Sequence, residues 1–461
     1  MHTILITVDA LRADHLGQYG HERDTMPALD RLTADGTRFE AAFSNAPYTR
    51  ISIPSFQTSQ FLAYDELAEL PTIASILGDS GVTTAAVGTQ TGVGLVDADF
   101  RFDQNLDLGR DEYHEEANSD RALRDRIVHR VDRLASRVGP LLRRVEPVYE
   151  AVDDAYRRLV PTPDFQYLGY TSAEVVTDTA VSWLEDNRDE DFFLWIHYME
   201  GHRPYGVHDE DPAYLDEPLD TDRIKRLMKT AGTAPEEISA SERRLLEDLY
   251  DSDLRYCSRH LDRLFDAMAD LGVWDDANVV FSSDHGEEFA EHGNYFHRNY
   301  PYDELIHVPL LVKREAGTAN DSDAPDTVEQ QRQLLDLAPT VCAFHGIDPE
   351  EFDFEGEPLF EGDDRRVVAL GSGRPDDEQV VAGRWDGWKF IYDDESVQLY
   401  DLDASPDETD CVADDHPEVV SEFREAIPEY LFDREDERLR DPVDGVEKEQ
   451  LEALGYLELK D

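Results

Sequence analysis

An apolar run that ends in acidic residues and histidines constrains this chain more than any other stretch. Val279, Val280 and Phe281 are followed by two serines and then by Asp284 and His285. Such a run is typical of a buried strand, and the polar pair that closes it would stand at the carboxyl end of that strand. The stretch therefore predicts a strand that delivers two metal-binding side chains. A solvated acidic loop is the alternative interpretation.

The first residues of the chain show the same arrangement. Residues 2–8 are largely apolar and β-branched, and the run ends at Asp9. A carboxylate directly after a strand lies at the carboxyl edge of a sheet, where open α/β folds bind their ligands. Asp9 is therefore a candidate metal ligand, with a helix N-cap as the alternative. Helical and strand patterns alternate through residues 70–88 and 173–196, which predicts an α/β fold.

Acidic residues dominate the composition and limit the partners. The chain of 461 residues carries 104 Asp and Glu against 43 Lys and Arg, a formal net charge of -61. This balance excludes binding to nucleic acid through a general basic surface. The carboxylates are spread along the whole length, so the surface resembles that of the cytoplasmic proteins of halophilic archaea. In molar salt the Debye length is about 3 Å, and such a surface does not repel itself strongly.

The cysteines and the apolar runs indicate a compartment. Cys257, Cys342 and Cys411 are isolated and lack the spacing of a disulfide framework or a zinc site. Residues 1–8 lack the basic region of a signal peptide, and no apolar run is long enough to span a bilayer. We therefore expect a soluble, cytoplasmic protein without membrane contact.

Residues 111–161 differ from the rest of the chain. Between Arg121 and Arg158 the arginines outnumber the carboxylates, and apolar residues recur at helical spacing. We interpret the segment as a helical insertion that packs over the site or mediates self-association. A basic amphipathic helix in contact with an anionic membrane surface is the less favoured alternative.

The order of several short motifs resembles that of the sulfatase family, which belongs to the alkaline phosphatase superfamily. In chain order they are LRADHLG (11–17), PALDRL (27–32), GTRF (36–39), HY (197–198), HRPY (202–205), SDHGE (283–287), EHG (291–293), YDE (302–304), VPL (308–310), DLAPT (336–340), GWKFIY (387–392) and LYDL (399–402). The resemblance implies an alkaline-phosphatase-like three-layer sandwich with a mostly parallel central sheet over residues 1–345. It also implies a smaller C-terminal subdomain of antiparallel sheet and helix over residues 346–461.

Residues 46–59 should hold the nucleophile, and they depart from the family pattern. Sulfatases carry a CxPxR signature whose cysteine becomes formylglycine, but this stretch contains no cysteine. In a gapless placement that matches Ser55 and Thr58, the cysteine position falls on Thr49. A placement that matches the proline selects Ser52 instead. Thr49 is the favoured nucleophile and Ser52 the runner-up, with an ordinary Ser/Thr-rich loop at a helix start as the alternative.

The resemblance also implies a metal set, formed by Asp9, Thr49, Asp284 and His285. It would bind one divalent ion, with Mn²⁺ or Mg²⁺ preferred and Ca²⁺ or Zn²⁺ as alternatives. The usual sulfatase pattern has a second Asp where this chain has Ala10, and an Asn at the position of His285. The set instead resembles that of phosphonate monoester hydrolases and of glycerolphosphate-transferring relatives, which use Asp or Glu, the nucleophile, Asp and His around a single metal. Together with the missing cysteine, His285 indicates a single-metal site of the non-formylglycine kind.

Three histidines complete the predicted site. His202 precedes the family's Pro-Tyr pair, and the resemblance implies that it binds the substrate and protonates the leaving oxygen. His297 lies where relatives have a Lys or His in contact with the transferred group, so it is assigned to catalysis and substrate binding. His292 would contact the substrate at the rim of the site. An incidental loop histidine is the alternative for His202.

Three functions remain open from the sequence. The first is a metal-dependent hydrolase of sulfate or phosphate esters, in which a metal-activated Thr49 attacks in line. The second is a transferase that hands the phospho or sulfo group to a glycan or lipid precursor. The third is a catalytically silent binding member of the family. The substrate would be a small-molecule ester or a glycan or lipid ester in each case.

Overall fold

A computed structural model describes residues 1–61, 70–88, 100–108, 170–209, 211–216, 219–317, 325–371, 380–393 and 396–432. The predicted insertion at 111–161 lies outside these residues. So do residues 318–324, which belong to an acidic stretch of about residues 316–327, and the last residues of the chain, from 433 onward. The boundary expected near residue 345 therefore stays a prediction, although the two kinds of sheet expected on either side of it are both present.

The centre of the fold is a nine-stranded sheet with the order β10-β2-β9-β6-β1-β5-β3-β4, to which β11 adds by pairing with β2. Only β9 runs antiparallel to its neighbours β2 and β6, and the other pairs are parallel. The mostly parallel sheet is thus confirmed. The strands are β1 (His2–Val8), β2 (Thr37–Phe43), β3 (Thr83–Gly88), β4 (Gln104–Asp107), β5 (Phe192–Tyr198), β6 (Ala277–Ser283), β9 (His307–Lys313), β10 (Thr327–Val328) and β11 (Arg332–Gln333).

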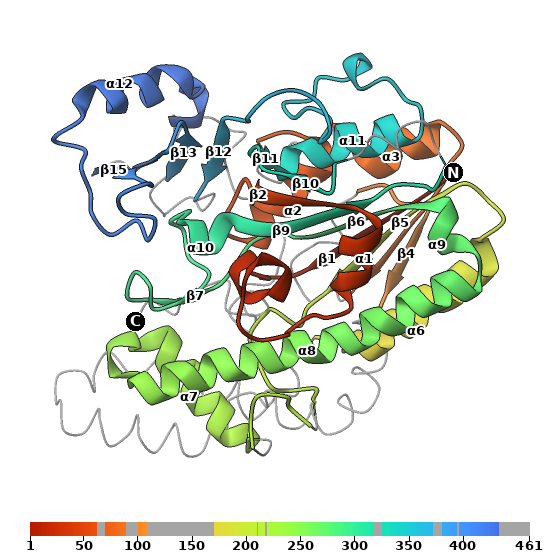
Figure 1. The fold of residues 1–461 in the computed structure, drawn as a ribbon, viewed down its shortest axis with the longest axis horizontal. Helices are drawn as coiled ribbons and strands as arrows, with labels where there is room; N and C mark the ends of the chain where they lie inside the picture. Colours follow the sequence, from red (N-terminus) through yellow and green to blue (C-terminus); the bar gives the residue numbers. More distant parts are fainter. Residues whose placement is uncertain are drawn as a thin grey trace, which may run out of the picture.

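Helices cover both faces of this sheet and make three layers (Figure 1). In β1, Ile4 and Ile6 enter one apolar core while Leu5 enters the other, because side chains of a strand alternate between its faces. The core that holds Ile4 is closed by α1 (Leu29–Asp35), α6 (Ala173–Asn187), α7 (Thr221–Thr233), α8 (Ala240–Asp270) and α9 (Val273–Asp276). The opposite core is closed by α2 (Thr49–Thr58), α3 (Ile73–Asp79) and α11 (Leu337–Phe344).

Local capping signals account for several helix starts. Ser239 and Glu242 form a capping box at the start of α8, as their spacing predicts. Thr72 caps α3 in the same way. Helix α1 begins at Leu29, after turns over residues 26–30 that are closed by backbone hydrogen bonds. The short 3-10 helices are η1 (Ala13–His15), η2 (Gly17–Tyr19), η5 (Pro235–Glu237), η6 (Leu334–Asp336), η7 (Pro349–Glu351) and η8 (Glu429–Phe432).

A second, antiparallel sheet follows in the C-terminal part, shown in blue in Figure 1. Its strands are β12 (Val367–Leu370), β13 (Val381–Trp385), β14 (Trp388–Tyr392) and β15 (Val397–Asp401). Helix α12 (Pro417–Ala426) packs on it, with the ring of Phe423 stacked 3.8 Å from Trp385. The predicted small sheet with a helix is therefore confirmed. The loop after β6 contains the hairpin of β7 (Glu288–Phe289) and β8 (Tyr295–Phe296) and then α10 (Asp303–Ile306).

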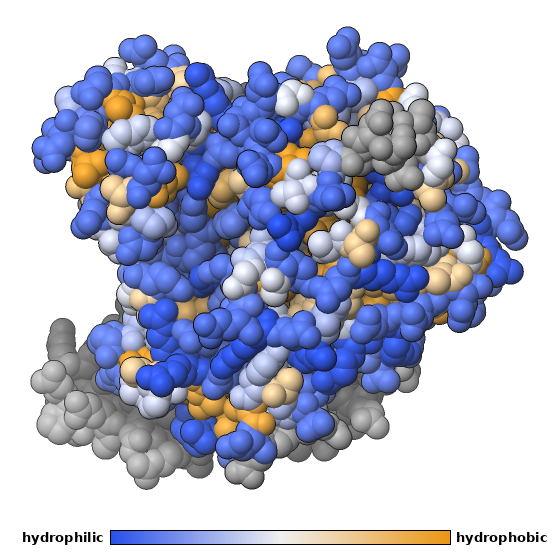
Figure 2. All heavy atoms as spheres, in the orientation of Figure 1, coloured by the Kyte–Doolittle hydropathy of each residue, from blue (hydrophilic) through white to orange (hydrophobic). Residues whose placement is uncertain are grey.

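The surface is hydrophilic over most of the face drawn in Figure 2, with apolar side chains in small patches. Among the described residues, only Met1 and Val175 are large hydrophobic side chains classed as exposed. Over those same ranges, no helix is both long and apolar enough to cross a membrane.

Candidate active site

Two strand ends form the base of the candidate site. β1 and β6 are parallel neighbours, and their register pairs Val8 with Ser283. The residues that follow, Asp9 and Asp284, therefore leave the same edge of the sheet, and both are fully buried. The backbone N–H of Ala10 donates to Asp284 Oδ1 across 3.2 Å, which ties the two strand ends together.

The side chain of Thr49 points at this edge from the first residue of α2. Its hydroxyl donates to Asp9 Oδ2 at 3.2 Å and lies 3.1 Å from His285 Nε2. A helix N-terminus carries partial positive charge and unpaired N–H groups, so it stabilises negative charge that develops beside the hydroxyl. The structure thus brings together Asp9, Thr49, Asp284 and His285, the residues that the sequence suggested as a metal set.

Ser52 lies one turn further along α2 and is engaged elsewhere. Its hydroxyl donates to the backbone carbonyl of Asp284 at 2.6 Å and accepts from Ser44 Oγ at 3.0 Å. These bonds fix the end of β6 against the helix. Ser52 thus supports the backbone at Asp284, whereas Thr49 contacts side chains that could bind a metal ion.

The two buried carboxyls differ in how readily they ionise. Burial raises the pKa of Asp284, and the negative charge of Asp9 raises it further. Burial acts in the same direction on Asp9, but the neighbouring His202 and His197 outweigh it and hold the pKa of Asp9 below its usual range. Within the described ranges, Asp9 Oδ1 and Asp284 Oδ2 have no hydrogen-bond partner. Two adjacent buried carboxyls with unbonded oxygens fit a bound cation.

His285 is oriented as a metal ligand would be. Its Nδ1 donates to the backbone carbonyl of Gly286 at 2.7 Å, so Nε2 is the nitrogen that faces the carboxyls and can offer its lone pair to a metal ion. That nitrogen lies 3.5 Å from Asp284 Oδ2 and 3.8 Å from Asp9 Oδ1. Burial alone would lower the pKa of His285, but Asp284 and Asp9 outweigh burial and raise it. One imidazole nitrogen and carboxylate oxygens form a donor set that suits Mn²⁺, Mg²⁺ or Zn²⁺.

His197 is a further member of the site. It belongs to β5, which pairs with β1 on the side away from β6, and its side chain is 3% exposed. Its Nε2 lies 3.6 Å from Asp9 Oδ2, and its Nδ1 lies 2.8 Å from Thr7 Oγ1. Thr7 also accepts a bond from Trp195 Nε1, which favours donation of the Thr7 proton to Nδ1 and leaves the ring proton on Nε2, facing Asp9.

His297 and His202 stand in a row with His285. The ring of His297 is 4.7 Å from that of His285 and 5.3 Å from that of His202. His297 Nδ1 lies 3.1 Å from Glu287 Oε1, and burial raises the pKa of Glu287 to about 7. Burial also lowers the pKa of His202 to about 4. The His202 imidazole is thus neutral in the free protein at pH 7, and it would need the negative charge of a bound ester to become a proton donor.

His292 has its described contacts outside this group. Its ring stacks on Tyr302 at 3.6 Å, and its Nε2 lies 3.4 Å from Glu304 Oε1. Its expected contact with the substrate stays a prediction.

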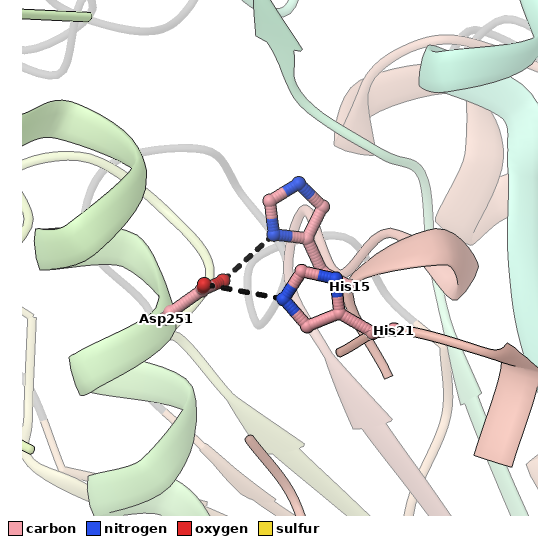
Figure 3. Close-up of side chains that lie close together, drawn as sticks. All are labelled: His15, His21 and Asp251. Carbon is pink, nitrogen blue, oxygen red and sulfur yellow. Dashed lines mark hydrogen bonds and ion pairs between the residues drawn. The ribbon is translucent and has the colours of Figure 1, made fainter. Parts of the chain in front are cut away.

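A separate cluster joins the N-terminal loops to α8. Figure 3 shows the imidazoles of His15 and His21 turned toward the carboxylate of Asp251, at 2.7 and 3.3 Å. Arg23 Nη1 donates to the same carboxylate at 2.7 Å. The guanidinium already neutralises the buried Asp251, so the cluster is a structural brace between the loop after β1 and the long helix.

Two glycines allow the loops of the site to pack closely. A Cβ added at Gly201 would stand 2.2 Å from the carbonyl oxygen of Asp9, and one added at Gly286 would stand 2.0 Å from that of Glu304. Ala10 has a positive φ of 55°, an uncommon conformation for a residue other than glycine. The backbone around Asp9 is thus tightly constrained, which is common at functional sites.

The sequence of the chain matches a known protein family over most of its length. Residues 1–347 match the family Sulfatase. The chain belongs to the sulfatase family. Among curated relatives of this family member, choline-sulfatase of Rhizobium meliloti is 28% identical over 167 residues, which are 34% of this chain and 31% of that protein. The multifunctional alkaline phosphatase superfamily protein PehA of Trinickia caryophylli is 24% identical over 292 residues, which are 57% and 53% of the two chains. The alignments thus span a limited share of these relatives.

Solved structures share the fold over more of the chain. The phosphonate monoester hydrolase of Agrobacterium radiobacter superposes with a TM-score of 0.65 at 18% identity, covering 92% of this chain and 94% of that one. A protein solved with its substrate D-glucosamine-2-N,6-O-disulfate superposes with a TM-score of 0.64 at 14% identity, covering 95% and 99%. These matches confirm the predicted alkaline-phosphatase-like architecture.

Two residues of the site in this sulfatase-family chain, His197 and Glu287, are not among the site residues predicted from the sequence. His197 ends an apolar run, and an isolated histidine on a strand is most often a core residue. One signal was available, because His197 lies near the end of the strand that precedes the HRPY motif. Glu287 forms part of the SDHGE motif, but only the structure shows that it holds His297 and accepts a bond from Tyr205.

Proposed function

We propose that this sulfatase-family chain is a divalent-metal-dependent hydrolase of sulfate or phosphate esters, with Thr49 as the nucleophile. The observation that carries the proposal is the position of the Thr49 hydroxyl. It stands at the N-terminus of α2, within hydrogen-bond distance of Asp9 and His285 and at the edge of a buried carboxylate pair. An ordinary Ser/Thr-rich helix start has no need for such surroundings.

Asp9, Asp284, His285 and Thr49 would hold the metal ion. The unbonded carboxylate oxygens and the lone pair of His285 Nε2 are the observations that fit it. When bound, a divalent cation supplies positive charge that lowers the pKa of a hydroxyl group and withdraws electrons from a sulfuryl or phosphoryl group. The set suits Mn²⁺ or Mg²⁺ first.

The chain's own residues then account for the attack of Thr49 on the ester and for the departure of the leaving oxygen. Asp9 Oδ2 accepts the hydrogen bond of the Thr49 hydroxyl and so orients its oxygen, and it would receive the hydroxyl proton as that oxygen bonds to sulfur or phosphorus and the bond to the leaving oxygen breaks. The N-terminus of α2 stabilises the negative charge of the ester oxygens. His297, held by Glu287, would contact the transferred group, and His202 would donate a proton to the leaving oxygen once the anionic ester raises its pKa.

Threonine also limits the reaction. It cannot form the aldehyde hydrate of formylglycine, so an ester of Thr49 has to be released by water or passed to an acceptor hydroxyl. Because the formylglycine route of sulfatases is closed to this chain, the proposed substrates comprise phosphate and phosphonate esters as well as sulfate esters. The structural likeness to a phosphonate monoester hydrolase supports this range. A glycan ester is one substrate class to test, because a neighbour in fold was solved with a sulfated glucosamine.

The proposal is tested by turnover. The purified protein, loaded with Mn²⁺ or Mg²⁺ at high salt, is assayed with an aryl sulfate, a phosphate monoester, a phosphate diester and a phosphonate monoester. We expect turnover of at least one ester, its loss on chelation, and its recovery when Mn²⁺ is restored. No turnover of any ester together with no bound metal would overturn the enzymatic proposal.

Paired variants test the nucleophile. Thr49→Ala should lower kcat at least about a thousandfold, because the attacking oxygen is removed. Thr49→Ser keeps a hydroxyl in place and should retain measurable activity. Ser52→Ala should keep most of the activity while losing about 1 to 3 kcal/mol of stability, because buried hydrogen bonds to Ser44 and Asp284 are lost. Loss of activity in Ser52→Ala alone would instead identify Ser52 as the nucleophile.

A further inference from the structure

A second group of metal-binding side chains lies where the main sheet meets the C-terminal sheet. His292 comes from the loop between β7 and β8, Glu304 from α10, and Glu408 from the loop after β15. One ligand atom from each residue lies within 4.8 Å of the other two. Glu408 lies 104 positions after Glu304 in the sequence, so only the tertiary structure brings it to the other two residues.

The three ligand atoms are buried, and two of them lack hydrogen bonds. The side chains of His292, Glu304 and Glu408 are 13%, 9% and 1% exposed. Within the part of the chain that the structure describes, no hydrogen-bond partner reaches His292 Nε2 or Glu304 Oε1, whereas Glu408 Oε1 faces Lys389 Nζ at 3.1 Å. A buried carboxylate oxygen without a donor is costly, and a coordinated cation is one of the few ways to satisfy it.

The rest of the cluster holds these atoms in place. The ring of His292 is stacked on Tyr302, and its backbone N–H donates to Glu288 Oε1 at 3.1 Å. The other carboxylate oxygen of Glu408, Oε2, accepts from the backbone N–H of Asp303 at 2.6 Å. The His292 ring and the Glu408 carboxylate are therefore held in place, each with one ligand atom left toward the common centre.

The two cations beside the cluster bind mainly Asp303. Lys389 Nζ lies 2.7 Å from Asp303 Oδ1 and 3.1 Å from Glu408 Oε1, and Arg384 Nε donates to Asp303 Oδ2 at 3.0 Å. Asp303 thus takes bonds from both cations. Glu408 shares Lys389 with Asp303. Among the described residues, Glu304 pairs with His292 alone.

We propose that His292, Glu304 and Glu408 bind a second divalent cation, Zn²⁺ in preference, which joins the loop after β6 to the C-terminal sheet. One imidazole nitrogen and two carboxylate oxygens are a donor set that zinc accepts. Ligands about 2.1 Å from a tetrahedral zinc are about 3.4 Å from one another. His292 Nε2 and Glu304 Oε1 are already 3.4 Å apart. Lys389 can keep its bond to Asp303 while Glu408 turns to the ion.

The stoichiometry of zinc tests this site on the full chain. The protein is stripped with a chelator, reloaded with ZnCl₂ alone and desalted, and the zinc content per chain is measured by mass spectrometry. Wild type should hold one more equivalent than Glu304→Gln or Glu408→Gln. Asp407→Asn removes an exposed carboxylate beside the site and is the matched control, which should hold as much zinc as wild type. Equal zinc content in all four proteins would overturn the proposal and leave a His292–Glu304 ion pair.

A second measurement leaves the proposed ligands unchanged. The double variant Asp9→Ala, Asp284→Ala lacks both carboxylates of the candidate active site and should still bind one zinc per chain. Zinc should also raise the Tm of this variant by several degrees when it is well above its Kd. A double variant that binds no zinc contradicts the second site, whatever the outcome for the catalytic metal. The two proposals therefore fail separately.

Discussion

Glu200 is a buried carboxyl that follows β5, next to the glycine that packs against Asp9. It is 1% exposed, and its Oε1 accepts from the backbone N–H of Ala173 at 2.6 Å. Over the described residues, its Oε2 has no hydrogen-bond partner. Burial raises the pKa of Glu200 to about 8, more strongly than its backbone hydrogen bonds lower it. The neutral acid is thus the form that suits the folded protein at pH 7.

The sign and size of the effect of Glu200→Gln follow from this pKa. In the unfolded chain a glutamate has a pKa of about 4.3, so the wild type loses stability as pH rises from about 4.3 toward 8. One pKa unit corresponds to about 1.4 kcal/mol, which sets the loss at about 3 to 5 kcal/mol above pH 8. Glutamine keeps an acceptor for Ala173 and cannot ionise. We expect a change within about 1 kcal/mol at pH 5 and a clear gain for the variant at pH 9.

Urea unfolding at pH 5 and pH 9, in the same salt, measures the difference. Glu185→Gln alters an exposed carboxylate on α6, and its effect should be independent of pH. If Glu200→Gln changes the free energy of unfolding equally at both pH values, Glu200 is ionised throughout. The assigned effect of burial would then be wrong.

Two further predictions concern parts that position the site. Asp251→Asn should lower the free energy of unfolding by about 2 to 3 kcal/mol at pH 7, because Arg23 and two histidines lose a buried anion. The value is smaller than for a fully buried ion pair, because Arg23 is partly exposed and solvent screens its charge. The low pKa of Asp251 means that this penalty shrinks as pH falls below about 4, and a pH-independent penalty in urea unfolding would contradict the brace. Gly201→Ala should cost about 2 to 4 kcal/mol and lower kcat, because the added Cβ would meet the carbonyl of Asp9. A variant with wild-type Tm and kcat would show that this contact is not tight.

Much of the frame could be predicted from the sequence. Apolar runs that end in Asp9 and Asp284 indicated buried parallel strands, and parallel neighbours necessarily present their carboxyl ends at one edge. The capping box at Ser239 fixed the start of the long helix for an equally local reason. Family motifs indicated the order of the elements and the smaller C-terminal sheet. These features depend on strand periodicity, helix capping or the order of motifs along the chain.

Only the tertiary structure decided which polar side chains meet. Thr49 and Ser52 lie on the same helix, and the packing of α2 on the sheet turns Thr49 to Asp9 and Ser52 to the backbone of Asp284. The tertiary structure also places His197 beside Asp9 and brings His292 close to Glu408 of the C-terminal part. Such contacts join residues up to hundreds of positions apart. They depend on helix rotation and strand register, which hydrophobic patterns specify only by face.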